Sequence, residues 1–284
     1  MTTDNAPVPP AAGRLSINQE TVRQLSVPDL VRVCAALGIG GVGLWRGPVR
    51  ELGVRRAAET VRAAGLTVSS LCRGGFLTAV DPDERAAALA DNRAAVEEAA
   101  TLGTGTLVLV SGGLPAGAKD LTAARERVAD ALAELAPYAA RHGVRLAVEA
   151  LHPMYASDRC VVSTLGQALD LAERFPADQV GVVVDTYHLW WDDRVPDLIA
   201  RAGAERRIAA FQLADWITPL PEGVLLGRGQ LGDGCVDLRA FREMVDAAGY
   251  TGPIEVEVFN PALWAGDGKR VVAGTAERYR RLVC

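Results

Sequence analysis

The chain has 284 residues, of which 49% are hydrophobic and 23% charged, so its composition and length suit a globular α/β protein of one large domain or two small ones. The formal net charge is −5 and no run of basic residues is present, which argues against nucleic acid as a partner because phosphate contacts need clustered Lys and Arg. No apolar run approaches the roughly 20 residues that cross a bilayer, so we expect a soluble protein without a membrane partner.

The beginning of the chain differs in composition from the rest. Residues 1–13 are rich in Pro, Ala and small polar residues, and they lack the basic start and apolar stretch of a signal peptide. We expect them to form a flexible tail, followed by a single domain over residues 14–284. The five cysteines are odd in number and show no CxxC pairing, which fits a protein of the reducing cytoplasm.

Short apolar or β-branched segments recur along the chain, and each is followed by a helix-like segment. Several of them show little alternation, as expected of parallel strands that are buried on both faces. The eight predicted strands span residues 14–18, 41–45, 67–71, 106–110, 145–151, 180–185, 208–213 and 253–259.

The segments between these strands carry the signals that begin and end helices. Ser26 can cap a helix with Asp29 three residues later, and an apolar stripe follows at Leu30, Val33, Cys34 and Leu37. A glycine stands before several of the strands, where a left-handed C-cap ends a helix. These glycines are Gly38, Gly65, Gly103, Gly143 and Gly249.

The number and size of these units predict the fold. Eight strand–helix units in about 250 residues are typical of the (β/α)8 barrel, whereas an open doubly wound sheet usually has five or six strands. We therefore predict an α/β fold with a single (β/α)8 TIM barrel. The longest irregular stretch, residues 215–236, follows the seventh strand, on the face where barrels carry their active sites.

Polar side chains stand at the ends of the last four predicted strands, where a buried strand is otherwise apolar. They are Glu149 in LAVEALHP, Asp185 in GVVVDTYH, Gln212 in AAFQLADW and Glu257 in IEVEVFN. Consecutive strands would bring them together at one side of the barrel mouth. Three carboxylates in one place repel one another unless a divalent ion lies between them, which favours a metal site. The alternative is that each acid pairs with an Arg or caps a loop by itself.

The ligand set indicates the kind of metal and its chemistry. Carboxylate and amide oxygens suit an octahedral ion, with Mn²⁺ as the first choice and Mg²⁺ or Co²⁺ as alternatives, and fit structural zinc poorly. Four protein ligands leave about two octahedral positions for neighbouring oxygens of a hydroxy-ketone. Such chelation would stabilise the enediolate that forms when the adjacent C–H loses its proton.

Two histidines follow proposed ligands by three residues, His152 after Glu149 and His188 after Asp185. This spacing places both at the predicted barrel mouth, where they are candidate substrate contacts. The alternative for each is a structural role in a loop. His142 ends a predicted helix, and we expect no functional role for it.

Basic and aromatic residues also fall on the predicted functional face. Arg228, in GRGQLGDG, lies in the long loop after the seventh strand and could bind a hydroxyl, carboxylate or phosphate, or instead pair with Asp233 at the surface. Arg73, in CRGG, is a second candidate. Tryptophans at or after strand ends could stack on a sugar, exclude water, pack the loops or form an oligomer interface. They are Trp45, Trp190, Trp191, Trp216 and Trp264.

The motifs VEALHP, VVVDTYH, FQLADW, GRGQLGDG and EVEVF resemble, in this order, those of the xylose isomerase-like TIM barrel superfamily, of the sugar phosphate isomerase/epimerase type. The resemblance extends from about residue 15 to the end of the chain. It implies substrate contacts at His152, His188 and Arg228. The metal ligands that it implies are Glu149, Asp185, Gln212 and Glu257.

One of these residues departs from the pattern of a related group. The ketose 3-epimerases usually carry His as the third metal ligand, whereas Gln212 is similar to what some dehydroshikimate dehydratases carry. The endonuclease IV branch uses a three-zinc cluster with many more histidines. Three histidines and a negative net charge argue against that branch and against DNA repair.

From these observations we predict an enzyme with a carbohydrate-like small-molecule substrate. The first hypothesis is a metal-dependent isomerase or epimerase of a sugar, keto-sugar or polyol, in which Glu149 and Glu257 exchange protons on opposite sides. The alternative is a lyase on the same site, either a dehydroshikimate- or inosose-dehydratase-like enzyme or one that cleaves an oxidised glycoside. A barrel that binds without catalysis is a third reading. The number of subunits is not specified by these residues, and a homo-oligomer is kept as an alternative to a monomer.

Overall fold

The computed structural model describes residues 11–284, in which eight parallel strands form a closed barrel. Around the barrel their order is β1-β10-β7-β6-β5-β4-β3-β2. All eight strands predicted from the sequence are confirmed, and the fold is the predicted single (β/α)8 TIM barrel. The strands are β1 (Leu15–Asn18), β2 (Gly41–Trp45), β3 (Thr67–Gly75), β4 (Thr106–Val110), β5 (Arg145–Glu149), β6 (Val180–Asp185), β7 (Ile208–Leu213) and β10 (Ile254–Val256).

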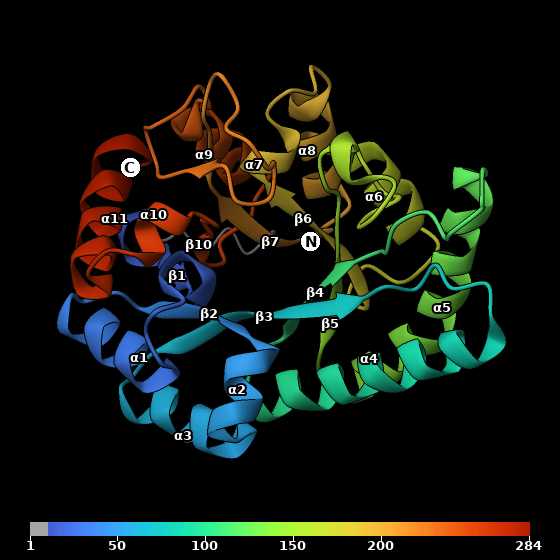
Figure 1. The fold of residues 1–284 in the computed structure, drawn as a ribbon, viewed down its shortest axis with the longest axis horizontal. Coiled ribbons are helices and arrows are strands. Elements are labelled where there is room, and N and C mark those ends of the chain that lie inside the picture. Colours follow the sequence, from blue (N-terminus) through green and yellow to red (C-terminus); the bar gives the residue numbers. More distant parts are fainter. Residues whose placement is uncertain (1–10) are drawn as a thin grey trace, which may run out of the picture.

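Helices surround the barrel, and the last long helix, α11, lies beside the first, α1 (Figure 1). The longer helices are α1 (Val27–Ala36), α2 (Arg46–Leu52), α3 (Val54–Ala63), α4 (Pro82–Leu102), α5 (Leu121–Arg141), α6 (Leu165–Ala172), α8 (Val195–Ala204), α9 (Leu238–Ala247) and α11 (Gly268–Leu282). Short elements lie in the connections. They are α7 (Thr186–Leu189), α10 (Pro261–Trp264), the 3-10 helices η1 (Ala11–Arg14), η2 (Gln19–Val22) and η3 (Pro153–Tyr155), and an antiparallel ribbon of β8 (Asp215–Trp216) with β9 (Arg228–Gly229).

The predicted helix signals act as expected. The Ser26 side chain accepts a hydrogen bond from the backbone N–H of Asp29 and caps α1. Leu37 is 37% exposed at the end of this helix, so it does not belong to the buried stripe. The predicted glycines have positive φ, which relieves the strain that a side chain would meet there. They are Gly38, Gly65, Gly103, Gly143 and Gly249.

The domain is anchored at its beginning by a buried arginine. The expected tail, residues 1–13, lies outside the described residues except for its last three, which belong to η1. Arg14 Nη1 lies 2.6 Å from Asp246 Oδ1, and its other nitrogens donate to the backbone oxygens of Gly252 and Tyr250. These contacts attach the start of the barrel to the segment that leads into β10.

Small side chains occupy one level of the barrel interior. Cys72, Val108, Ala147, Val183 and Ala210, from β3 to β7, form a buried cluster separate from the core between strands and helices. Side chains alternate along a regular strand, so on β5, β6 and β7 the residue two positions after the cluster residue also faces the interior. On β5, β6 and β7 that residue is a predicted metal ligand.

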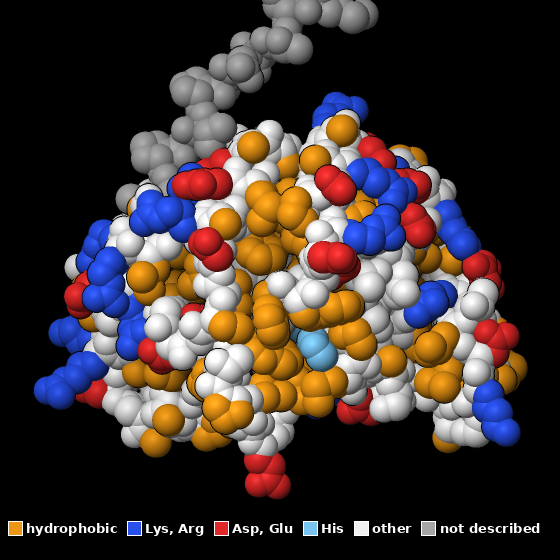
Figure 2. All heavy atoms as spheres, turned by 90° about the horizontal axis from the view of Figure 1, so that it is seen from above, with side chains coloured by type: hydrophobic (Ala, Val, Ile, Leu, Met, Phe, Trp, Pro, Cys, Tyr) orange, Lys and Arg blue, Asp and Glu red, His pale blue; other side chains and the backbone are white. Residues whose placement is uncertain are grey.

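The outer surface includes a broad apolar area. On the face shown in Figure 2, hydrophobic side chains gather over the middle and charged side chains lie mostly toward the margins. A contact with another subunit would cover such an area, and the oligomer interface stays a prediction. Among residues 11–284, no helix has the length and apolar character needed to cross a membrane.

Candidate metal and substrate site

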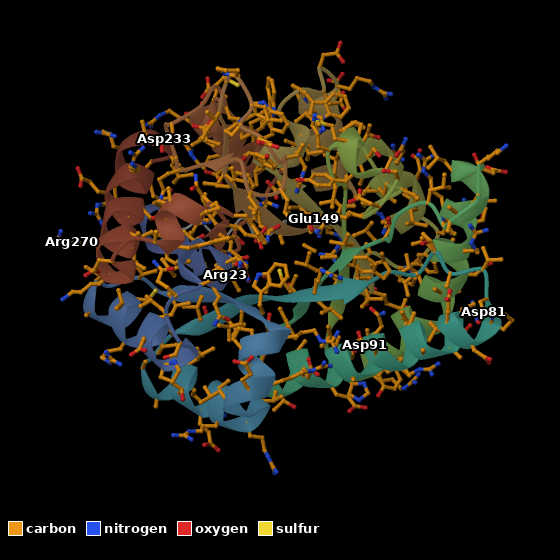
Figure 3. All side chains as sticks on the ribbon, in the orientation of Figure 1. Arg23, Asp81, Asp91, Glu149, Asp233 and Arg270 are labelled. Atoms are coloured by element: carbon orange, nitrogen blue, oxygen red, sulfur yellow. The ribbon has the colours of Figure 1, made fainter. Side chains whose placement is uncertain are left out.

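The predicted ligands lie at the carboxyl ends of four strands that are consecutive around the barrel. Glu149 ends β5 and Asp185 ends β6, while Gln212 lies one residue before the end of β7 and Glu257 directly follows β10. Their exposed fractions are 5%, 1%, 1% and 4%. In Figure 3, Glu149 lies near the middle of the molecule and Asp81 at its edge.

Short distances join these residues into one cluster. Ligand atoms of Glu149 and Asp185 lie within 4.8 Å of each other. Arg228 Nη1 lies 3.1 Å from Glu257 Oε2 and 3.6 Å from Asp185 Oδ2. Gln212 is the partner of Asp185 in the register between β6 and β7. The convergence expected from the sequence is therefore present in the structure.

Two oxygen atoms of the cluster are buried without a hydrogen bond, namely Asp185 Oδ2 and Gln212 Oε1. The other oxygen of Asp185 accepts from the backbone N–H of Tyr187 at 2.8 Å. Gln212 Nε2 donates to Glu255 Oε1 at 3.0 Å, so its amide oxygen is turned away from that contact. A buried acceptor without a donor is costly, and a cation between these oxygens would remove the cost.

The carboxyl groups show the repulsion expected of neighbouring acids. Burial raises the pKa of Glu149 well above its usual value, and the nearby Asp185 and Glu257 raise it further. The pKa of Glu257 rises to about 8, chiefly because of burial, although Arg228 opposes this shift. Burial also raises the pKa of Asp185. Without a cation the cluster therefore tends to hold protons.

His188 is buried beside the acids and lies in α7. Its Nδ1 accepts the backbone N–H of His152 at 3.1 Å, and its Nε2 lies 3.3 Å from Arg228 Nη2, so an N–H donor faces each ring nitrogen. Nε2 lies 3.9 Å from Glu149 Oε1 and 3.8 Å from Asp185 Oδ2. Burial holds the pKa of His188 well below its usual value, and Arg228 lowers it further. A neutral imidazole is thus held between the His152 backbone and Arg228, with its Nε2 edge toward the acids.

Arg228 lies inside the site and not on the surface. Its guanidinium packs between the rings of Tyr187 and Phe259, at 4.8 and 4.6 Å from their centroids, and is 4% exposed. Asp233, the alternative partner considered from the sequence, pairs instead with Arg278 at 2.6 Å. That alternative is wrong because the loop folds inward and directs Arg228 toward Glu257.

Asp215 holds this loop in place, and the sequence analysis did not assign it a role. Its Oδ1 accepts the backbone N–H groups of Trp216 and Val236, and its Oδ2 accepts those of Gly232 and Gly234. A carboxylate that accepts four backbone N–H groups holds the surrounding backbone in one conformation. It fixes both ends of the segment that carries Arg228. The sequence feature that could have identified Asp215 is an acidic residue at the end of a buried strand, followed by a glycine-rich loop.

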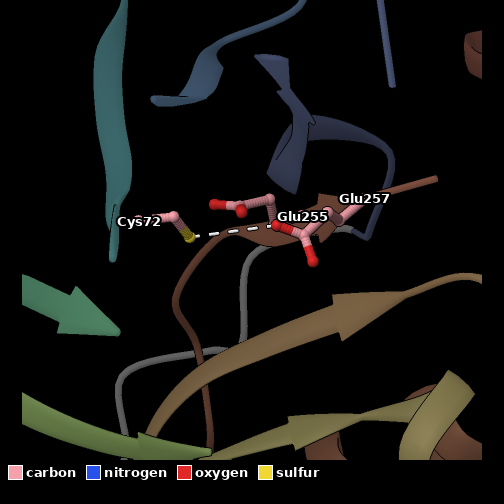
Figure 4. A group of neighbouring side chains, drawn as sticks. All are labelled: Cys72, Glu255 and Glu257. Atoms are coloured by element: carbon pink, nitrogen blue, oxygen red, sulfur yellow. Dashed lines mark hydrogen bonds between the residues drawn. The ribbon is translucent and has the colours of Figure 1, made fainter. Parts of the chain in front are cut away.

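Glu255 is a second residue that the sequence analysis missed. It faces the interior two positions before Glu257 (Figure 4). Its carboxylate accepts hydrogen bonds from four side chains on three strands, namely Asn18 of β1, Ser69 and Ser70 of β3, and Gln212 of β7. Gly43 makes room for it, since a Cβ there would lie 2.5 Å from the carboxylate. Both glutamates of EVEV share one strand face, and that alternation was the available signal.

Cys72 also lies beside these glutamates. Its Sγ donates to Glu257 Oε1 at 3.8 Å, and burial raises the pKa of the thiol well above its usual value. Cys72, Glu255 and Glu257 form a second group whose ligand atoms lie within 4.8 Å of one another. Because Glu255 already accepts several donors, this group is less suited to a cation than the group around Asp185.

His152 and three tryptophans form an aromatic cluster beside the site. The His152 ring stacks on Trp216 at 4.8 Å and meets the edge of Trp191 at 5.7 Å, while Trp190 packs against Trp216. His152 therefore reaches the site through its backbone N–H. The other tryptophans lie apart: Trp45 lines the pocket, and Trp264 ends α10 and donates to a backbone oxygen of η2.

A pocket of about 120 Å³ opens over the acids. Its walls combine apolar and charged side chains, which is the pattern of small-molecule sites. They are Trp45, Cys72, Arg73, Val108, Val110, Glu149, Leu151, Tyr155, Arg159, His188, Leu225, Arg228, Glu257 and Phe259. The structure thus places Glu149, Glu257, His188 and Arg228 on one small cavity.

Comparison with solved structures supports the fold. Protein SMc04130 from Sinorhizobium meliloti is 45% identical and superposes with a TM-score of 0.92, over 96% of this chain and 99% of that one. The IolI protein with a bound zinc atom is 20% identical and superposes with a TM-score of 0.83, over 95% and 98%. At this identity the second likeness concerns the fold alone.

Curated relatives match about half of the chain. An inosose isomerase from Halalkalibacterium halodurans is 29% identical over 134 residues, which are 46% of this chain and 45% of that protein. A 3-dehydroshikimate dehydratase from Pseudomonas aeruginosa is 38% identical over 138 residues, 47% and 20%. The matched region therefore spans less than half the length of either relative. The family described as xylose isomerase-like TIM barrel matches residues 31–280, and the chain belongs to this family.

Proposed function

We propose that this protein is an enzyme that binds one divalent metal ion and moves protons next to the carbonyl of a sugar-like substrate. The residues that would hold the ion are Glu149, Asp185, Gln212 and Glu257. The observation that carries the proposal is the pair of buried oxygens, Asp185 Oδ2 and Gln212 Oε1, that lack a hydrogen bond beside two further carboxyl groups. Such oxygens are what a cation site offers.

Mn²⁺ is the ion that we propose, with Mg²⁺ and Co²⁺ as alternatives. Carboxylate and amide oxygens are hard ligands, and manganese and magnesium prefer them. Bound there, the ion would polarise a substrate carbonyl and stabilise the negative charge that develops when the neighbouring C–H loses its proton.

The two glutamates are the proposed proton carriers. Glu149 ends β5 and Glu257 follows β10, and these strands are separated around the barrel by β6 and β7. A substrate in the pocket would therefore have one glutamate on each side. Arg228 holds Glu257 Oε2 at 3.1 Å, whereas Oε1 has only the long contact with the Cys72 thiol at 3.8 Å and would carry the proton. Burial raises the pKa of both glutamates, which suits groups that take up a proton as well as release one.

His188 and Arg228 are the proposed substrate contacts. His188 lines the pocket, where its Nε2 edge can contact a substrate oxygen. Arg228 keeps Glu257 in place and can also interact with that oxygen. Isomerisation or epimerisation follows if the proton returns to a neighbouring carbon or to the opposite face.

A lyase on the same site is the second candidate. Gln212 favours it, because the residue resembles the ligand of some dehydroshikimate dehydratases, and a relative with that name is 38% identical over the matched region. The first step is the same loss of a proton. A β-hydroxyl or a β-linked group then leaves, and an unsaturated product results.

The proposal is tested by metal analysis and proton exchange. Protein from cells grown with Mn²⁺ is expected to contain about one divalent ion per chain. Inosose and 3-dehydroshikimate are then incubated with it in D₂O and followed by NMR. Deuterium in recovered substrate and product without a dehydrated compound indicates an isomerase or epimerase, whereas a new product that has lost water, unsaturated from inosose or aromatic from 3-dehydroshikimate, indicates a lyase.

Two variants make the test specific. Glu257→Gln is expected to lose at least about a hundredfold in turnover, and Glu277→Gln, which alters an exposed residue of α11, is expected to keep it. Full turnover by Glu257→Gln with metal bound would refute the scheme with two bases. Protein free of any divalent ion after growth with Mn²⁺ would refute the metal site and favour a barrel that binds without catalysis.

A further inference from the structure

We propose that Arg73 and Arg159 form an anion-binding subsite in the same pocket, and that the substrate therefore carries a carboxylate or phosphate group. The inference rests on the proposed function in one respect, namely that the pocket takes a substrate. It goes beyond that function because neither arginine contributes to the metal cluster or to proton transfer.

Arg73 is a half-buried cation without a partner. It lies in β3 directly after Cys72 and lines the pocket. Among residues 11–284, its guanidinium makes no hydrogen bond and no ion pair, and it rests over the Phe76 ring at 4.1 Å from the centroid. This stacking leaves the N–H edge of the guanidinium free. Burial lowers the pKa of Arg73, and the charge of Arg159 lowers it further.

A neighbouring arginine shows how unusual this is. Arg46 begins α2 and is also largely buried, but it pairs with Asp91 at 2.7 Å and Glu98 at 2.8 Å. A buried charge normally has such a partner, because desolvation is otherwise costly. The missing partner of Arg73 would be supplied by a ligand that enters the pocket.

Arg159 faces the same pocket from the segment between η3 and α6. Its nearest carboxylate is that of Asp158 at 3.9 Å, and that side chain is 63% exposed. The backbone around Arg159 is held firmly: its N–H donates to Tyr155 O at 2.9 Å, and the next residue forms a bridge with Gly112. Gly113 allows this close approach, since a Cβ there would lie 2.4 Å from Asp158 C.

The charges in the pocket divide into two groups. Arg228 is paired with Glu257, whereas Glu149 acts on Arg73 only through its charge and without a contact. Arg73 thus has no contacting anion among residues 11–284, Arg159 has only Asp158 at 3.9 Å, and the two arginines repel each other. An oxyanion between them would accept hydrogen bonds from both, in the planar geometry that guanidinium groups offer to carboxylate and phosphate.

The subsite specifies a substrate class. The pocket of about 120 Å³ takes a small molecule and no polymer. Its charged walls suit a ring or short chain that has an oxygenated, enolisable end at Glu149 and Glu257 and an anionic group at Arg73 and Arg159. A neutral sugar would leave these two arginines without partners, so we expect the enzyme to discriminate against it.

The test uses calorimetric titration of the full chain, freed of metal by chelation and dialysis, at low salt and neutral pH. The probes are cyclohexanecarboxylate, inorganic phosphate and the neutral cyclohexylmethanol. One of the two anions is expected to saturate a single site, and the preferred one identifies the charged group of the substrate. The alcohol is expected to bind at least about tenfold more weakly.

Variants connect this binding to the two arginines. Arg73→Gln and Arg159→Gln are each expected to weaken the anion by about tenfold or more, while the alcohol is unaffected. Arg62→Gln, the same change at an exposed position of α3, is the matched control and is expected to keep wild-type affinity. Circular dichroism of each variant checks that it is folded. Arg159 lies in a loop, so Arg159→Gln still tests the subsite if Arg73→Gln disturbs β3.

Three results would overturn the inference: wild-type protein that binds neither anion, binding that both variants leave intact, or an alcohol that binds as well as the acid. Since the titration uses metal-free protein, it is independent of the proposed function. Failure to bind Mn²⁺ or to exchange protons, together with normal anion binding, would refute the function alone. The opposite pattern would refute the subsite alone.

Discussion

Above about pH 6.5, where His188 is neutral in both the folded and the unfolded chain, removal of the divalent ion is expected to make the stability of this protein fall as the pH rises to about 8. The reason is the raised pKa of Glu257, which is about 8 in the folded chain against an ordinary value of 4.5. A carboxyl whose folded pKa is raised contributes stability that is complete below its unfolded pKa and is lost as the pH rises through its folded pKa. Burial of Glu149 shifts its pKa in the same direction.

The size of the effect follows from the shift. A rise from 4.5 to about 8 corresponds to a loss on the order of 5 kcal/mol once Glu257 is fully ionised. For a chain of this length, that loss lowers Tm on the order of 10 °C. An ion bound to the carboxylates takes the place of the protons, so the metal-loaded protein should not show this fall.

The assay is thermal unfolding followed by circular dichroism between pH 6.5 and pH 8.5, with chelated protein and with protein saturated with Mn²⁺. The two Tm curves are expected to separate as the pH rises. Glu257→Gln provides the control, because an uncharged amide cannot titrate, and the slope for the metal-free variant should be shallower. A metal-free wild-type protein whose Tm stays level or increases over this range would refute the reasoning.

Three further substitutions test the parts that support the site. Asp215→Asn places an amide N–H opposite backbone N–H donors, and we expect the free energy of unfolding to fall by roughly 2–5 kcal/mol. The loop that carries Arg228 should then be cleaved faster by a protease, and an unchanged cleavage rate would contradict this. Gly43→Ala sets a methyl group 2.5 Å from the Glu255 carboxylate and should cost roughly 1–3 kcal/mol in urea unfolding, so wild-type stability would count against a fixed carboxylate. Gln212→His exchanges an oxygen ligand for a nitrogen ligand and should shift metal preference from Mn²⁺ toward Zn²⁺, which competition titration would detect; an unaltered preference would show that this residue is no ligand.

The strands and the convergence of the ligands could be predicted because they follow from local patterns. An apolar run that ends in Glu149 or Asp185 marks both a buried strand and the polar group at its end. Eight repeats of this unit limit the fold to very few architectures. The carboxyl ends of the strands lie on one face of a barrel, so polar residues at the ends of neighbouring strands could be expected to lie close together.

The loops were harder to predict because their conformations depend on distant residues. Arg228 has no local signal that selects Glu257 over Asp233, and the inward path of its loop depends on Asp215. Glu255 was missed because its donors come from β1 and β3 at the other end of the chain. Arg159 lies in an irregular segment whose anchoring to Gly112 has no periodic pattern.

The four contacts of Asp215 close the segment 216–236 into a ring without a covalent bond. The entropy cost of closing a ring increases only with the logarithm of its length. A change in the length of the stretch 217–227 therefore costs little in loop-closure entropy, while Arg228 keeps its place at the base. Because Leu225 from this stretch lines the pocket, the protein has a region in which new specificities can arise by insertion, with the charged centre beneath it unchanged.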